Sequence, residues 1–171
     1  LWSARIFRAR GSNEVNRLVD IDSDPYQMGE RLIIAGFQAQ ISAVSLKTRR
    51  IEWDADYSTL RPLSAVGDIL LVTADDGSVS GLDIQSGTQI WKLDALLGRG
   101  VSGPFGLEPR GFAGVGGYKG LLYLLDAASG EFVGRKKGGG GAVLGIYGAG
   151  DDDRFVTLSE NGSLTAWAVG E

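Results

Sequence analysis

The chain has 171 residues, of which 43% are hydrophobic and 27 are glycine, so it can bury a core and form many tight turns. Its net charge of −4 gives no reason to expect a nucleic-acid partner, because a phosphate-binding face needs clustered Lys and Arg. The lack of cysteine and histidine excludes disulfides, thiolate metal sites and the most common general base. We therefore predict no catalytic residue, no metal and no cofactor, and no apolar run is long enough to span a bilayer.

The first 24 residues do not follow a sustained hydrophobic period. Residues 1–8 are predicted to form one outer strand of a preceding repeat unit, with Trp2 at the position that tryptophans hold in later units. Residues 9–24 are predicted to form a long loop, with one helical turn over 14–18, and long ordered loops on a repeat scaffold often carry function. The chain begins without an initiator Met or a leader, so we expect a fragment of a longer repeat protein.

The rest of the chain is predicted to contain only strands and turns, apart from a helical turn over 94–98. Three units of four strands are expected at 25–60, 61–98 and 99–138, followed by an incomplete unit of three strands at 139–171. The predicted strands lie at 26–29, 31–37, 40–46, 50–57, 63–66, 68–74, 78–84, 88–93, 103–107, 111–116, 121–126, 131–136, 142–147, 154–158 and 163–169. Together with 1–8 these make sixteen strands, and we expect 1–8 to complete the last unit, in the same molecule or in a neighbouring copy.

The clearest pattern is a hairpin that occurs twice with the same spacing. Its first copy has Gly77, Asp83, Gly87 and Trp91, and its second has Gly120, Asp126 and Gly130. The Asp side chain is expected to bind the turn amides, and the second Gly to take a positive φ. Weaker copies begin at Ala39, which leads to Trp53, and at Gly162, so the four copies are 38, 43 and 42 residues apart. Such periods indicate an all-β propeller of four-stranded antiparallel blades, with about four blades in this chain.

Two segments resemble ligand-binding motifs without completing them. Asp20, Asp22 and Asp24 resemble the start of a calcium loop, but Pro25 and Arg31 occupy the positions that need Gly and Glu. This stretch is either a solvated acidic loop or a docking surface for a basic partner. The glycine-rich segment over 136–141 lacks the Ser/Thr and the helix of a phosphate loop and is more simply a connection between blades.

The sequence 82–91 resembles the tryptophan-docking motif of quinoprotein-type propellers. Within that superfamily, nearly the whole chain is similar to the C-terminal half of the BamB family, on the residues 1–6, 11–22, 94–99 and 162–166. The resemblance implies a lipid-anchored, eight-bladed, non-catalytic scaffold on the periplasmic side of the bacterial outer membrane, which aids the assembly of β-barrel proteins. It implies two kinds of partner, the POTRA domains of BamA and unfolded outer-membrane proteins.

The same resemblance implies that Asp20 and Asp22 contact the POTRA domains, and we add Arg17 and Leu18 to the candidate partner-binding set. A second contact loop of the family and its lipidated cysteine have no counterpart here, so the fragment should be soluble and bind its partner weakly. The first hairpin departs from the repeat at Ala39, Ser45 and Arg49. Two other functions remain open, a quinone-dependent dehydrogenase and a ligand-sensing receptor domain. The chain could also form a homodimer in which two fragments complete a propeller.

Overall fold

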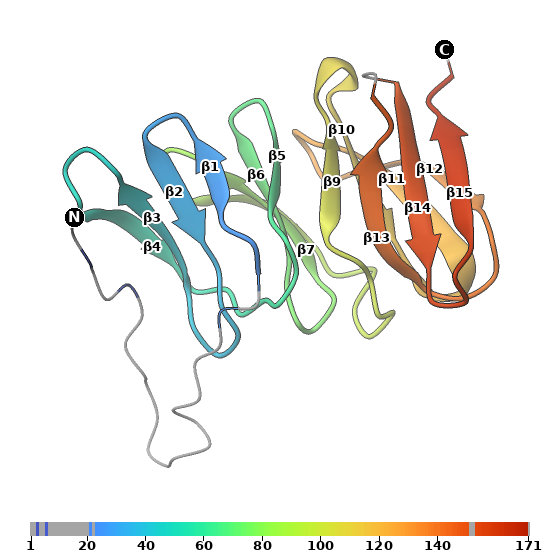
Figure 1. Cartoon of the computed structure of the whole chain (residues 1–171), viewed down its shortest axis with the longest axis horizontal. Helices are drawn as coiled ribbons and strands as arrows, with labels where there is room; N and C mark the ends of the chain where they lie inside the picture. The colour runs from blue at the N-terminus through green and yellow to red at the C-terminus, as the bar shows by residue number, and fades with distance from the viewer. Residues whose placement is uncertain (1–2, 4–5, 7–20, 22, 151–152, 171) are drawn as a thin grey trace.

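The computed structural model describes residues 3, 6, 21, 23–150 and 153–170. These residues form four antiparallel sheets that stand side by side as an open arc, with the first and last sheets at its two ends (Figure 1). The predicted all-β architecture of four-stranded propeller blades is confirmed. Within the described part of the chain the first three sheets have four strands each and the last has three.

Each sheet uses consecutive strands joined by short turns. The first sheet has β1 (Tyr26–Met28), β2 (Arg31–Ile34), β3 (Ile41–Ser45) and β4 (Ile51–Ala55), and the second has β5 (Ser64–Val66), β6 (Ile69–Thr73), β7 (Val79–Asp83) and β8 (Gln89–Leu93). The third has β9 (Pro104–Leu107), β10 (Phe112–Gly116), β11 (Leu121–Asp126) and β12 (Phe132–Lys137), and the last has β13 (Val143–Gly148), β14 (Arg154–Ser159) and β15 (Leu164–Ala168). Strand order follows chain order in every sheet.

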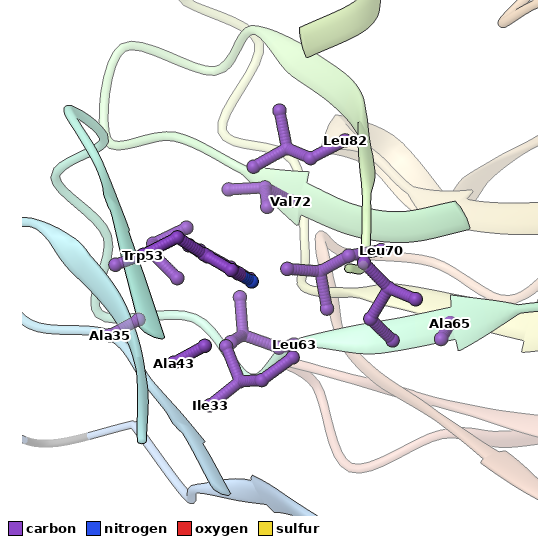
Figure 2. Close-up of a cluster of buried hydrophobic side chains, with 11 residues drawn as sticks. Ile33, Ala35, Ala43, Trp53, Leu63, Ala65, Leu70, Val72 and Leu82 are labelled. Atoms are coloured by element: carbon purple, nitrogen blue, oxygen red, sulfur yellow. The ribbon is translucent and has the colours of Figure 1, made fainter. Parts of the chain in front are cut away.

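The hydrophobic core lies between neighbouring sheets. Figure 2 shows the first of these layers, where Ile33, Trp53 and other residues of the first sheet face Leu70, Val72 and Leu82 of the second. Central strands are therefore covered on both sides. In β11, Leu122 packs toward the last sheet while Leu125 packs toward the second, which explains why this strand is apolar throughout.

The loops divide between two faces of the arc. The connection face carries the links between sheets and the turns between the second and third strands of each sheet. Backbone hydrogen bonds hold links and turns together, such as Asp75 N to Ser58 O at 3.0 Å and Gly98 N to Asp76 O at 3.0 Å. We define this face by residues 35–40, 56–63, 74–78, 94–103, 117–120, 138–142 and 160–163. The opposite hairpin face carries residues 29–30, 46–50, 67–68, 84–88, 108–111 and 127–131.

Some local predictions were wrong or lie outside the described residues. Residues 95–98 form hydrogen-bonded turns in place of the expected helical turn, with Leu97 N bonded to Asp94 O at 3.1 Å. Gly98 has a positive φ of 66° at the predicted end, while the carboxylate of Asp94 lies 3.1 Å from the ammonium group of Lys92. Short 3₁₀ helices at Glu108–Arg110 and Tyr118–Gly120 were not expected. Two predictions lie outside the described residues. They are the strand over 1–8 with Trp2, of which only Ser3 and Ile6 are described, and the helical turn over 14–18. No helix in the described part of the chain is both long and apolar enough to cross a membrane.

Candidate functional site: a partner-binding face

The predicted partner-binding residues Arg17, Leu18, Asp20 and Asp22 all lie outside the described residues, but the end of their loop is anchored. The buried hydroxyl of Ser23 donates a hydrogen bond of 3.0 Å to the backbone carbonyl of Arg61, in the link between the first two sheets. Ile21, two residues earlier, is 51% exposed. The loop therefore enters β1 at the connection face, where an exposed apolar side chain is available to a partner.

A hollow of about 360 Å³ opens on the same face, between the first and second sheets. Its lining includes three carboxylates, Asp56, Asp75 and Asp76, and one cation, Lys92. The carboxylate of Asp75 accepts bonds from the Ser58 hydroxyl at 2.5 Å and from the Leu60 amide at 3.3 Å. These bonds fix the charge to the link that also holds Ser23.

Asp76 and Lys92 are held in their charged forms by hydrogen bonds. The hydroxyl and the amide of Ser78 bind the carboxylate of Asp76 at 2.7 and 2.8 Å and lower its pKa below the ordinary value. The hydrogen bond and charge of Asp94 raise the pKa of Lys92. An anionic surface of this kind attracts Lys and Arg side chains of a partner. Asp75 and Asp76 were not among the predicted site residues, because their sequence pattern indicates only a turn.

The turns of the repeated hairpins lie on the opposite hairpin face, and their turn chemistry is as predicted. The carboxylate of Asp83 accepts the Gln85 and Ser86 amides at 3.1 and 2.7 Å, while that of Asp126 accepts the next hairpin's two equivalent amides at 3.1 and 2.8 Å. Bonds from the side chain and amide of Ser86 lower the pKa of Asp83, and bonds from its counterpart in the second hairpin lower that of Asp126.

The repeat glycines allow these turns because all four have a positive φ. The angle is 90° at Gly77, 72° at Gly87, 73° at Gly120 and 74° at Gly130. The first hairpin achieves the same shape without a glycine, since Arg49 has a φ of 62°. The repeat therefore extends to the first sheet even though its sequence departs there.

Two tryptophans lock neighbouring sheets together, as predicted. The ring of Trp53 lies on Gly87 of the second sheet, and the ring of Trp91 lies on Gly130 of the third, so close that a Cβ at either glycine would overlap the indole. The indole Nε1 of Trp91 also donates to the carbonyl of Ala127 at 2.9 Å. Both side chains are buried and serve as packing between blades.

The two tryptophan contacts differ in one hydrogen bond. The buried Nε1 of Trp53 has no partner among the described residues, although Ile84 is the counterpart of Ala127 in the second sheet. The guanidinium of Arg31 donates to the Ile84 carbonyl instead, at 3.1 Å, and to the side chain of Gln85 at 2.6 Å. An arginine thus joins the first two sheets where an indole joins the next two.

Comparisons with known proteins agree with this architecture. A family model described as outer membrane protein assembly factor BamB matches residues 1–93. The BamB of Burkholderia pseudomallei (strain K96243) is 33% identical over 143 residues, 83% of this chain and 37% of that protein. The BamB of Legionella pneumophila (strain Paris) is 28% identical over 169 residues, 99% of this chain and 43% of that protein.

A solved structure shows the same fold. The chain superposes on the crystal structure of BamB from Moraxella catarrhalis with a TM-score of 0.88 and 24% identity, over 99% of this chain and 49% of that one. It therefore spans less than half the length of the relatives named above and about half of this solved chain. From the family match over more than half of its residues, we conclude that the chain belongs to the BamB family of outer membrane protein assembly factors.

Proposed function

We propose that this chain is part of a non-catalytic scaffold of the outer-membrane β-barrel assembly machinery, acting on the periplasmic side of the outer membrane. The observation that carries the proposal is the BamB family match over residues 1–93, which includes the whole of the acidic loop 9–24 and the first two sheets. The curated relatives carry the name of an assembly factor and not of an enzyme. The lack of histidine and cysteine also suits a binding role.

We place the contact with the POTRA domains of BamA on the connection face. Asp20 and Asp22 precede Ser23, whose bond to Arg61 directs the loop to that face, beside the hollow that contains Asp75 and Asp76. Carboxylates there can form charge-assisted hydrogen bonds with basic residues of a partner, and salt weakens such contacts. Exposed Ile21 adds apolar area that an interface needs at its centre.

The test uses a full-length protein that contains this segment, with Asp20 and Asp22 both changed to Arg. We expect binding to purified POTRA domains, measured by calorimetry or surface plasmon resonance, to weaken at least tenfold, because two attractive charges become repulsive. The melting temperature should stay unchanged. Wild-type affinity should also fall as salt concentration rises.

The matched control reverses two charges on the opposite face, Asp68→Arg with Glu131→Arg. Both side chains are exposed on the hairpin face, so the net charge changes equally while the connection face is left intact. This variant should bind like the wild type. If both double variants bind equally well, the acidic loop is only solvated surface and the proposed contact is wrong.

A further inference from the structure

A groove on the outer rim of the arc lies between the link after β8 and the outer strand β12. It has a volume of about 440 Å³, and we call it the rim groove. Its lining comprises Ala95, Leu96, Arg99, Tyr123, Phe132, Val133, Gly134 and Arg135. None of these residues belongs to the acidic hollow on the connection face.

The walls of the rim groove are apolar and only partly covered. Phe132 is 46% exposed and Val133 is 49% exposed, and the bulge in the pairing of β11 with β12 falls at these residues, both of which line the groove. The ring of Phe132 contacts that of Tyr123, with 5.7 Å between ring centroids. An apolar side chain from a partner would complete this aromatic pair and remove both walls from water.

The rim groove also contains an unused hydrogen-bonding group. Tyr123 is only 4% exposed, and its hydroxyl forms no hydrogen bond with any described residue. The position equivalent to Phe132 in the preceding sheet is Gln89, whose side chain accepts a bond of 2.6 Å from the hydroxyl of Tyr57. In the rim groove the positions that correspond to this pair are Phe132 and Ala95, which cannot form that bond, so the Tyr123 hydroxyl beside them is available to a polar group of a ligand.

Two arginines give the rim groove a positive charge in a chain whose net charge is −4. Arg99 and Arg135 are exposed at its border, and neither has an ion pair with a carboxylate among the described residues. The exposed residues Lys136 and Lys137 continue the basic stretch along β12. Arg side chains bind carboxylates well because their N–H groups match the two oxygens.

The edge of β12 is also open. In the third sheet β12 is the terminal strand, and it pairs only with β11 among the described residues. An extended peptide can add to such an edge through its backbone while its side chains enter neighbouring pockets. The rim groove lies directly at this edge, since four of its lining residues belong to β12.

We propose that the rim groove binds an extended peptide in which an apolar or aromatic side chain stands next to a carboxylate. The apolar side chain would enter between Phe132 and Tyr123, and the carboxylate would pair with Arg99 and Arg135. This binding activity is separate from that of the acidic hollow and of the segment 9–24, because it selects the opposite charge. It does not depend on the proposed contact with BamA.

The test measures fluorescence anisotropy of a labelled, blocked hexapeptide, Gly-Ser-Thr-Phe-Asp-Thr, with the chain. We expect saturable binding that becomes weaker with salt, and a roughly tenfold or greater loss when Asp of the peptide is replaced by Asn or Phe by Ser. In the protein, Arg99→Gln with Arg135→Gln should cause a similar loss. Tyr123→Phe, which removes only the hydroxyl, should weaken binding a few-fold.

The matched control is Lys47→Gln with Arg50→Gln, which removes the same charge from exposed positions on the hairpin face. It should bind the peptide like the wild type, and all variants should keep the wild-type circular dichroism and melting temperature. If the rim-groove variant and the control variant weaken peptide binding equally, the weakening comes from the lower net charge alone and the proposal is overturned. Equal binding of the Asp and Asn peptides would also overturn it. The proposal is also wrong if the peptide does not bind while phosphatidylglycerol vesicles bind the wild type and not the Arg99→Gln with Arg135→Gln variant. The rim groove would then bind a membrane surface.

Discussion

At the scale of single residues, the equivalent side chains Trp53 and Trp91 differ in their neighbours and in their hydrogen bonds. Trp91 stands opposite Gly81 in the register of β7 and β8, and its indole lies on the bare backbone of that glycine. Trp53 stands opposite Ala43, whose methyl group occupies the equivalent space. The indole of Trp91 reaches the carbonyl of Ala127, whereas that of Trp53 leaves its N–H unpaired. In the first two sheets the carbonyl of Ile84, the counterpart of Ala127, accepts its bond from Arg31 instead.

This difference predicts unequal losses for one substitution at two sites. Trp91→Phe and Trp53→Phe both remove buried ring area, but only Trp91→Phe leaves a buried carbonyl without its donor. We expect Trp91→Phe to lower the free energy of unfolding by about 1 kcal/mol more than Trp53→Phe. Urea denaturation followed by circular dichroism measures both values. Equal losses, or a larger loss at Trp53, would contradict the role given to the Ala127 bond.

At the scale of elements, the hairpins show which parts of the fold could be predicted from sequence. The turn bonds of Asp83 and Asp126 and the positive φ of Gly87 depend on residues a few positions apart. Local chemistry fixes them, so spacing was sufficient to predict them. Strand bounds were also within about three residues at each end, as expected from alternating patterns and turn residues.

Features that depend on distant residues could not be predicted in this way. Arg31 binds the carbonyl of Ile84, which is 53 positions further along the chain, and no local pattern indicates this contact. Residues 95–98 form turns where a helical turn was expected, and the carboxylate of Asp94 pairs with Lys92. The rim groove depends on three segments meeting, around Arg99, Tyr123 and Arg135. The partner-binding prediction for Asp20 and Asp22 remains untested.

The hairpin turns predict that Gly→Ala substitutions at two turn positions lower stability by different amounts. Gly87 and Gly67 both have a positive φ, of 72° and 55°, so Ala at either site should cost about 1 kcal/mol in backbone strain. At Gly87 the new Cβ would also overlap the ring of Trp53, while at Gly67 it would meet nothing within 4 Å. We expect Gly87→Ala to cost at least twice as much as Gly67→Ala, because overpacking adds about 1–3 kcal/mol. Thermal denaturation compares them, and similar melting temperatures would refute the tight tryptophan contact.

At the scale of the whole molecule, the arc has an apolar end that no described residue covers. On the last sheet, Tyr147 is 55% exposed and Leu164 is 67% exposed. The faces between sheets elsewhere in the arc are filled by buried clusters, so the same kind of face here remains open. The chain matches 49% of the Moraxella catarrhalis BamB chain, so two copies together would have about the length of that chain.

This open end predicts self-association of the 171-residue chain. Light scattering after size exclusion should detect a dimer at high protein concentration, because two apolar ends would be buried together. Tyr147→Glu with Leu164→Glu should shift it to a monomer. Ile90→Glu is the control, since Ile90 is 48% exposed on the rim strand β8 and should leave the dimer intact. A wild-type chain that stays monomeric at every concentration would contradict the prediction.

At Gly134, the contact between the third and fourth sheets differs from the contacts between the other sheets. It occupies the outer-strand position that Trp53 and Trp91 hold in the first two sheets, and beside it a hollow of about 260 Å³ separates the third sheet from the fourth. Among the described residues the third sheet sends no indole across that seam, but the ring of Trp167 on the last sheet lies on Gly138, just after β12, and the ring centroid of Phe155 lies 6.1 Å from that of Phe105. Because the hollow leaves this seam less filled and the last sheet has only three described strands, local opening should start there, with the last sheet separating before the first three do. Amide hydrogens of β13–β15 would then exchange with solvent while those of the first three sheets remain protected.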